Sequence, residues 1–184
     1  ENPHHFHGIL AAMARASGES KRKSELIGSA LKIKKAEVIQ EHLEGSGQIK
    51  FHGNCPSWLK PVYDDPVSKD RVVIAFKPIA EKVEAIKKIF RLKKQGYGGH
   101  TIAKMLTEDG TPHITGKKRK WLRTYIYKIL QWKAVIGEGQ MFETKDVKGK
   151  RTYIPVGEPI PNYYGKGVID EKLFWEVQQK KKTA

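Results

Sequence analysis

Residues Val83 to Gln140 read VEAIKKIFRLKKQGYGGHTIAKMLTEDGTPHITGKKRKWLRTYIYKILQWKAVIGEGQ, and this stretch decides the fold. Its apolar residues recur at helical spacing, which predicts helices over about 79–94, 101–107 and 121–131. A glycine-rich turn joins the first two helices, and a polar loop precedes the third. Side chains predicted to face a shared core are Ala80, Val83, Ile86, Ile89, Phe90, Ile102, Met105, Leu106, Trp121, Leu122, Ile126, Ile129 and Leu130.

The third helix of this stretch is strongly basic. No acidic residue occurs between Gly110 and Val135. A basic helix on a small helical core is a common way to read the major groove of DNA, with arginine suited to guanine and lysine to phosphate. Residues predicted to contact DNA here are Lys117, Lys118, Arg119, Lys120, Arg123, Thr124, Tyr127 and Lys128. His100 and Thr101 begin the second helix, where free backbone N–H groups suit a phosphate.

The rest of the chain divides around this block. Residues from about Phe6 to Leu43 predict one long helix, too polar in its middle to bury itself. The glycine-rich segment 44–56 predicts a linker. Strands are predicted over 58–63 and 71–77, a second hairpin over 135–155, and a final helix over 170–181 with Asp170 as N-cap. We therefore expect an α+β, mainly helical fold with three parts: the long helix 1–43, the linker 44–56, and a helix-turn-helix-like domain with short β-hairpins, 57–184.

The overall composition points to a polyanionic partner. The formal net charge of the 184 residues is +15, and the sequence pI is about 9.8. Such an excess attracts DNA, RNA or an acidic surface. Cys55 is the only cysteine, which excludes an intramolecular disulfide and a cysteine zinc cluster. His4, His5 and His7 have no acidic or cysteine partner at ligand spacing, so we expect no metal or other cofactor. No apolar run approaches the roughly 20 residues that a membrane helix needs, so we expect no membrane span. The single cysteine fits a reducing cytoplasm, which is the expected location.

Several segments, in this order and spacing, resemble the large serine recombinases. The segments AIKKIF, QGYGGHTIAKMLTEDG and KWLRTYIYKILQWKAVIGEGQ resemble the recombinase domain of that family, as do CPSWLK and PIPNYYGKGVIDEKLFWEVQ at its two ends. AAMARASGESKRKSELIGSALKIKKA resembles the helix that closes the family's catalytic domain, with Glu19, Ser20, Lys23 and Ser24 fitting its pattern. The resemblance covers nearly the whole chain.

The resemblance implies a role in site-specific DNA recombination. In the family a serine hydroxyl attacks a DNA phosphate, and strands are exchanged within a tetramer without ATP or a catalytic metal. The family's nucleophile lies in a domain with no counterpart in this sequence, so we expect this chain to bind double-stranded DNA without cutting it. The resemblance also implies a homodimer or tetramer of the full-length parent, and a bacterial or phage-encoded protein associated with the nucleoid.

The long helix and the second hairpin supply further expected DNA contacts. By resemblance, the first half of the helix belongs to a subunit interface and the second half crosses the DNA backbone. Leu26 stands where the family often has arginine. The expected phosphate contacts of the helix are Lys21, Arg22, Lys32, Lys34 and Lys35. The turn with Lys145, Lys148, Lys150 and Arg151 is either a wing that reaches the backbone or a solvated loop.

Two other functions fit the same residues. One is a helix-turn-helix regulator without catalysis, for which the basic third helix would suffice. The other is an RNA-binding or ribosome-associated protein, since net charge alone does not distinguish nucleic acids. The aromatic residues fit buried positions better than an array of stacking platforms, which favours DNA.

Overall fold

The computed structural model describes most of the chain. The described residues are 3–44, 55–65, 67, 72–116, 119–147 and 149–179, with α1 side chains from Met13 onward except Ala14 and Leu43. Most of the predicted linker, the three N-terminal histidine side chains, Lys117, Lys118 and Lys148 lie outside them. The elements are α1 Pro3–Leu43, β1 Leu59–Tyr63, β2 Val73–Pro78, α2 Ala80–Lys94, α3 Gly99–Glu108, α4 Arg123–Gln131, the 3-10 turn η2 Lys133–Ile136, β3 Gly139–Val147, β4 Lys150–Ile160 and α5 Glu171–Gln179.

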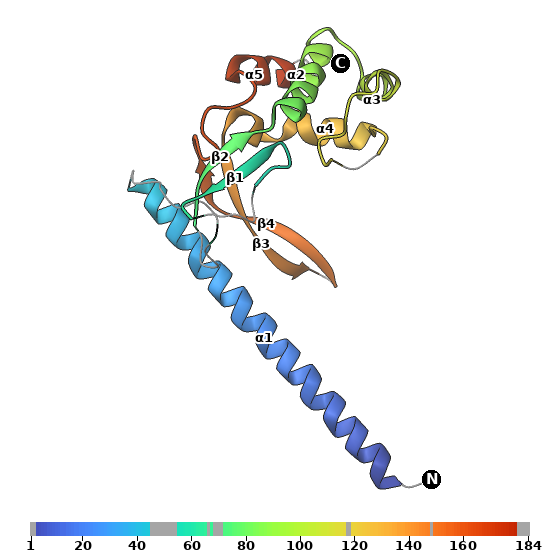
Figure 1. The fold of residues 1–184 in the computed structure, drawn as a ribbon, viewed down its shortest axis with the longest axis vertical. Helices are drawn as coiled ribbons and strands as arrows, with labels where there is room; N and C mark the ends of the chain where they lie inside the picture. Colours follow the sequence, from blue (N-terminus) through green and yellow to red (C-terminus); the bar gives the residue numbers. More distant parts are fainter. Residues whose placement is uncertain are drawn as a thin grey trace.

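The arrangement confirms the predicted α+β class. Helices α2, α3, α4 and α5 gather at one end of the molecule, two separate antiparallel hairpins lie beside them, and α1 projects away from both (Figure 1). In the first hairpin Leu59 pairs with Pro78, and in the second Val147 pairs with Lys150. Much of the core lies at the helical end, and it continues to the base of the second hairpin, as buried Met141 and Ile160 show.

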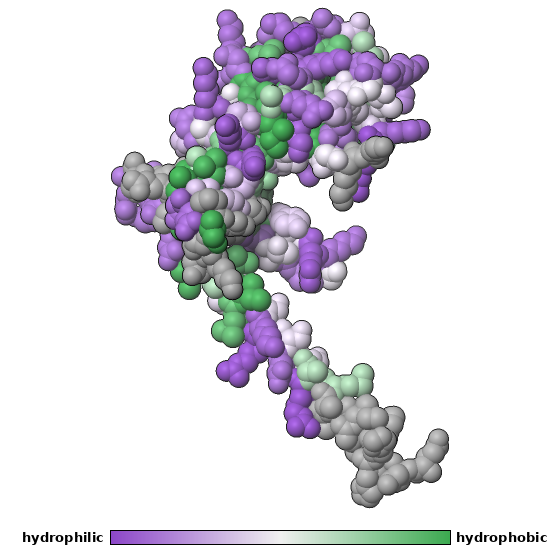
Figure 2. Space-filling view, viewed as in Figure 1, coloured by the Kyte–Doolittle hydropathy of each residue, from purple (hydrophilic) through white to green (hydrophobic). Residues whose placement is uncertain are grey.

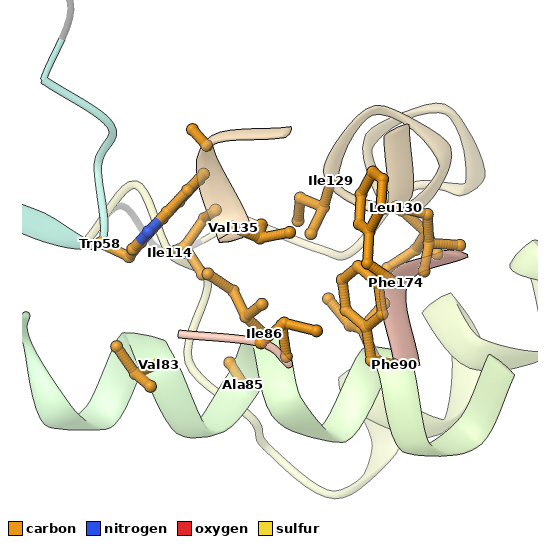
Figure 3. Close-up of a cluster of buried hydrophobic side chains, with 14 of the residues drawn as sticks. Trp58, Val83, Ala85, Ile86, Phe90, Ile114, Ile129, Leu130, Val135 and Phe174 are labelled. Carbon is orange, nitrogen blue, oxygen red and sulfur yellow. The ribbon is translucent and has the colours of Figure 1, made fainter. Parts of the chain in front are cut away.

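The core forms where α2 meets the other helices. Ile86, Ile89 and Phe90 of α2 are fully buried, and Phe90 packs against Phe174 of α5 with ring centroids 6.1 Å apart (Figure 3). The predicted inward residues of α2 are confirmed except for Ala80, which is exposed. Ala80 is the first residue of the helix, and the preceding Ile79 is half-buried in its place, its amide donating to the Trp58 carbonyl at 2.9 Å.

The start of α4 differs from the prediction. Trp121 is buried, as expected, but Leu122 is 62% exposed. The helix begins at Arg123, and Leu122 is its N-cap with extended backbone, φ −116° and ψ 144°. Successive side chains of an extended segment point to opposite sides. The inward Trp121 therefore turns Leu122 outward, which a helix beginning at residue 121 would not do.

Trp121 anchors the long segment between α3 and α4. Its indole Nε1 donates to the Thr111 carbonyl at 2.9 Å, and its amide donates to the Thr107 hydroxyl at 3.3 Å. The buried His113 ring packs against the rings of both Trp121 and Tyr125, with centroid distances of 4.6 Å and 4.7 Å. The segment is thus tied to the helices on both sides, which fixes the point where α4 begins.

Two glycines allow a tight backbone crossing after α4. Gly137 ends the η2 turn with φ 91°, and a Cβ there would lie 2.3 Å from the Gly165 carbonyl oxygen. A Cβ at Gly139 would lie 2.5 Å from Cγ of Tyr163. The second hairpin was predicted to begin at residue 135, but the chain first makes the η2 turn and enters β3 at Gly139. Side chains at these two glycines would separate β3 from the 163–167 segment.

Among the described residues of α1, those of its last turns pack on other elements. Val38 is fully buried, and the His42 ring meets Tyr163 edge to face at 5.2 Å. The Lys35 ammonium donates to the Phe142 carbonyl of β3. Earlier described side chains of α1 are exposed, as its polar middle predicts. None of the described helices is long and apolar enough to cross a membrane.

The C-terminal helix agrees with its predicted cap. The Asp170 carboxylate accepts a hydrogen bond from the Leu173 amide at 3.3 Å, and Phe174 and Val177 are buried. Gln178 donates to the Leu130 carbonyl at 2.6 Å, which satisfies an acceptor near the C-terminal end of α4. Helix α5 therefore packs against the C-terminal end of α4.

Substitutions at a buried and an exposed leucine test the packing assigned to this core. Leu106 of α3 is fully buried and Leu122 is 62% exposed. We expect Leu106→Ala to lower the free energy of unfolding by about 2–5 kcal/mol, because it leaves a cavity. The same deletion at Leu122 should change it by less than about 0.5 kcal/mol. Urea unfolding followed by circular dichroism measures both, and equal effects would contradict the assigned packing.

The buried His113 should make the free energy of unfolding depend on pH. Desolvation, and then the positive charge of Arg119, lower the pKa of the His113 imidazole from its ordinary 6.5. The unfolded chain therefore binds the proton more readily, so His113 should reduce the free energy of unfolding as pH falls below about 6.5. In His113→Gln this contribution should vanish. Urea unfolding of both proteins from pH 7.5 to 5 measures it, and parallel pH curves would show that His113 contributes nothing.

Candidate nucleic-acid interface

A shallow hollow lies between α3 and the beginning of α4. Its volume is about 350 Å³. Helix α3 places His100 and Lys104 on one side of it, one turn apart, and the other side carries Lys120, Leu122 and Arg123. The hollow follows from the anchored Trp121, because that residue fixes how the chain enters α4 next to α3.

The charges around the hollow are mostly uncompensated. Lys104 and Glu108 form an exposed pair at 3.7 Å, one turn apart on α3, and such pairs contribute little. In the described part of the chain no carboxylate forms an ion pair with Lys120 or Arg123. The hollow is therefore a cationic surface with an exposed leucine in it.

Other basic residues of the predicted set flank the hollow. Arg119 and Lys120 line a neighbouring depression beside His113. Farther along α4, the Lys128 ammonium lies 5.7 Å from the centroid of the Trp132 ring. Thr101 and Thr124 are exposed at the first turns of α3 and α4. The structure thus brings His100, Lys120 and Arg123 together, with Arg119 beside them and Lys128 at the other end of the helix.

Tyr127 takes a different position from the one predicted. It is half-buried rather than on the outer face of α4. A Cβ at Gly99 would lie 2.9 Å from Cε2 of its ring, so the missing side chain at residue 99 makes room for it. Tyr127 packs α4 against the first turn of α3.

The cations of α1 form a second group. Lys21, Arg22, Lys32 and Lys34 are exposed, whereas Lys35 is half-buried and bound to the Phe142 carbonyl. Lys35 therefore connects α1 to β3, a role that the sequence does not reveal. Along the same helix Leu26, Ile27, Leu31 and Ile33 are exposed apolar residues. Figure 2 shows hydrophobic side chains along part of the projecting helix, and a helical body above it that bears many hydrophilic side chains.

The second hairpin carries the third group. Lys150 and Arg151 are exposed at the start of β4, and Lys148 lies outside the described residues. Lys145 pairs with Glu143 at 2.7 Å. The hydrogen bond from Lys145 is the largest cause of a lowered pKa of the Glu143 carboxyl, and the charges of Lys32 and Lys35 lower it further. The base of the hairpin is therefore locally neutralised, while Lys150 and Arg151 have no ion-pair partner in the described part.

Sequence reasoning missed two residues of the hollow. Lys104 lies four positions after His100 on α3, so helical periodicity could have identified it. Leu122 had no such signal, because its apolar side chain fits the core pattern of a helix that begins two residues earlier. Only the extended backbone before α4 shows that Leu122 is exposed.

A curated relative resembles nearly all of this chain. The uncharacterized protein YbcK of Escherichia coli (strain K12) is 31% identical over 171 residues, which cover 93% of this chain and 29% of the relative. The chain thus spans less than a third of the length of that relative. No solved structure matches significantly.

The family comparison agrees with the resemblance in the central block. The model of the family described as Recombinase matches residues 80–184, which run from the first residue of α2 to the last residue of the chain. This match takes in α3, α4, the second hairpin and the two glycines of the tight crossing. Since it covers more than half of the sequence, the chain belongs to the Recombinase family.

Proposed function

We propose that this chain binds double-stranded DNA and recognises a recombination site for a serine recombinase. The hollow between α3 and α4 carries the proposal. His100 of α3, Lys120 of the segment before α4 and Arg123 of α4 converge there, without a carboxylate partner for the lysine or the arginine in the described residues. A surface of this kind binds the phosphate backbone while the beginning of α4 enters the major groove.

Different residues of the hollow would contact the bases and the phosphates of DNA. Arg123 begins α4, and an arginine there can donate two hydrogen bonds to a guanine. Lys104, Lys120 and His100 are suited to phosphates on either side, which set the register without reading sequence. Arg119, Thr101, Thr124 and Lys128 extend this surface, and Lys117 and Lys118 would join it from the same loop.

Helix α1 and the second hairpin would extend the interface. The exposed Lys21, Arg22, Lys32 and Lys34 suit the DNA backbone, and Lys150 and Arg151 suit a wing. We also propose that the chain has three parts: the long helix 1–43, the linker 44–56 and the DNA-binding domain 57–184. The exposed apolar Leu26, Ile27, Leu31 and Ile33 support a subunit contact that continues from the first half of α1 into its second half.

Strand cleavage and exchange belong to the proposal for the whole protein. The chain spans 29% of the length of the curated relative, so a serine nucleophile is not assigned to any residue here. The contribution proposed for this chain is to bind the site and hold DNA in register for strand exchange.

Arg123 gives a direct test of base reading. Arg123→Ala should weaken binding to a duplex selected from a random pool by about 1–3 kcal/mol, because alanine cannot donate the two hydrogen bonds to the base. Binding to random duplexes should weaken much less. Fluorescence anisotropy at fixed salt measures both. The control is Arg91→Ala, which removes the same charge from the exposed side of α2. Equal weakening on both duplexes would show that Arg123 contacts only phosphate.

Lys21 and Arg22 test the binding of DNA along α1. The double substitution Lys21→Ala/Arg22→Ala should weaken selected and random duplexes alike, because phosphate contacts carry no sequence information. The slope of log K against log salt should become shallower by roughly 0.9 for each phosphate that the variant no longer neutralises. A salt titration of the wild type and the double variant measures the slope. An unchanged slope would remove these two residues from the interface.

A further inference from the structure

Leu122 is an exposed apolar side chain in the middle of a cationic surface. It is 62% exposed and lines the same hollow as Lys120 and Arg123, its close neighbours in sequence. A single exposed leucine is ordinary on a protein surface. Leu122 differs in its position at the start of α4, because the first residues of a recognition helix are those that reach base edges.

The backbone around Leu122 is held in place. Its carbonyl accepts hydrogen bonds from the Tyr125 amide at 3.0 Å and the Ile126 amide at 3.1 Å, which begin α4. The preceding Trp121 is buried and fixed through its indole Nε1 to Thr111. With extended backbone at residue 122, the Leu122 side chain is directed away from the core. The leucine is therefore presented on a fixed backbone.

The chemistry of leucine limits what it can recognise in duplex DNA. It has neither a hydrogen-bond donor nor an acceptor, so it cannot pair with the polar edges of the bases. Thymine presents a methyl group in the major groove, where apolar side chains contact it. We propose that Leu122 is a specificity-determining residue that recognises the 5-methyl group of a thymine next to the base read by Arg123. This inference rests on the proposed binding of DNA.

The charges around Leu122 favour DNA over a protein as the occupant of this surface. The core of a protein–protein interface is depleted of charged residues. Here Lys120 and Arg123 flank the leucine, and His100 and the Lys104–Glu108 ion pair face it across the hollow. An apolar side chain between two cations that form no ion pair with a carboxylate in the described part of the chain suits a ligand that carries both phosphates and an apolar group.

Deoxyuridine provides the test, because it differs from thymidine only in lacking the methyl group. A duplex selected from a random pool by the full chain would be remade with each thymine replaced in turn. In the wild type we expect one replacement to weaken binding about fourfold, the factor for one buried methyl group. In Leu122→Ala the same replacement should have no effect. The control Ile74→Ala removes an exposed apolar side chain from β2 and should keep the wild-type response.

The outcomes separate the inference from the function on which it rests. Selection of a motif whose thymines all tolerate deoxyuridine, or a motif without thymine, would overturn the role of Leu122 and leave DNA recognition standing. The same would follow if deoxyuridine weakened binding as much in Leu122→Ala as in the wild type. If the pool yielded no motif at all, the proposed site recognition would fail, and the inference with it.

Discussion

Burial of the Trp121 indole is the interaction on which the proposed interface depends. Its bond to the Thr111 carbonyl and its packing against the His113 ring tie the long segment after α3 to the core. That anchor fixes how the chain enters α4, while packing of Ile126 and Ile129 holds the helix itself in the core. The consequence extends to the next two residues, because an inward Trp121 on an extended backbone directs Leu122 outward and places Arg123 at the start of the helix. The interface is thus positioned by one buried aromatic side chain, not by the charged residues themselves.

The basic surface is tolerated because an apolar scaffold carries it. Like charges repel one another, and a net charge of +15 opposes the compact state. The opposing contribution comes from buried residues such as Ile86, Phe90 and Phe174, which pack behind the helices that present the cations. Desolvation also keeps the buried His113 from adding another positive charge, since it lowers the pKa of that imidazole. Binding of a polyanion would relieve the remaining repulsion, which links the stability of this fold to its proposed ligand.

Much of the fold could be predicted from the sequence, because helical periodicity reports directly on burial. Ile86, Ile102 and Ile126 fall on the faces that the pattern indicates, and Asp170 caps α5 as its side chain suggests. The misses occur where backbone conformation changes. Ala80 and Leu122 lie at helix starts, where a periodic pattern does not show which residue begins the helix. The tertiary contacts of two predicted DNA-binding residues were also not predictable: Tyr127 packs beside Gly99 and Lys35 donates to the Phe142 carbonyl, and both partners are distant in sequence. Whether Tyr127 and Lys35 contact DNA stays a prediction. The sequence also does not show that α3 and α4 line one hollow, because this depends on how the two helices pack in the folded chain.

Binding of duplex DNA at the hollow between α3 and α4 is the central claim. The most direct measurement is a backbone-amide NMR titration of the uniformly ¹⁵N-labelled chain with a selected duplex, because it maps the bound surface without altering any side chain. We predict that the largest shift changes cluster at His100 to Lys104 and at Lys120 to Thr124, and that they depend on the sequence of the duplex. Changes confined to α1 and the second hairpin, with these two segments unaffected, would contradict the claim.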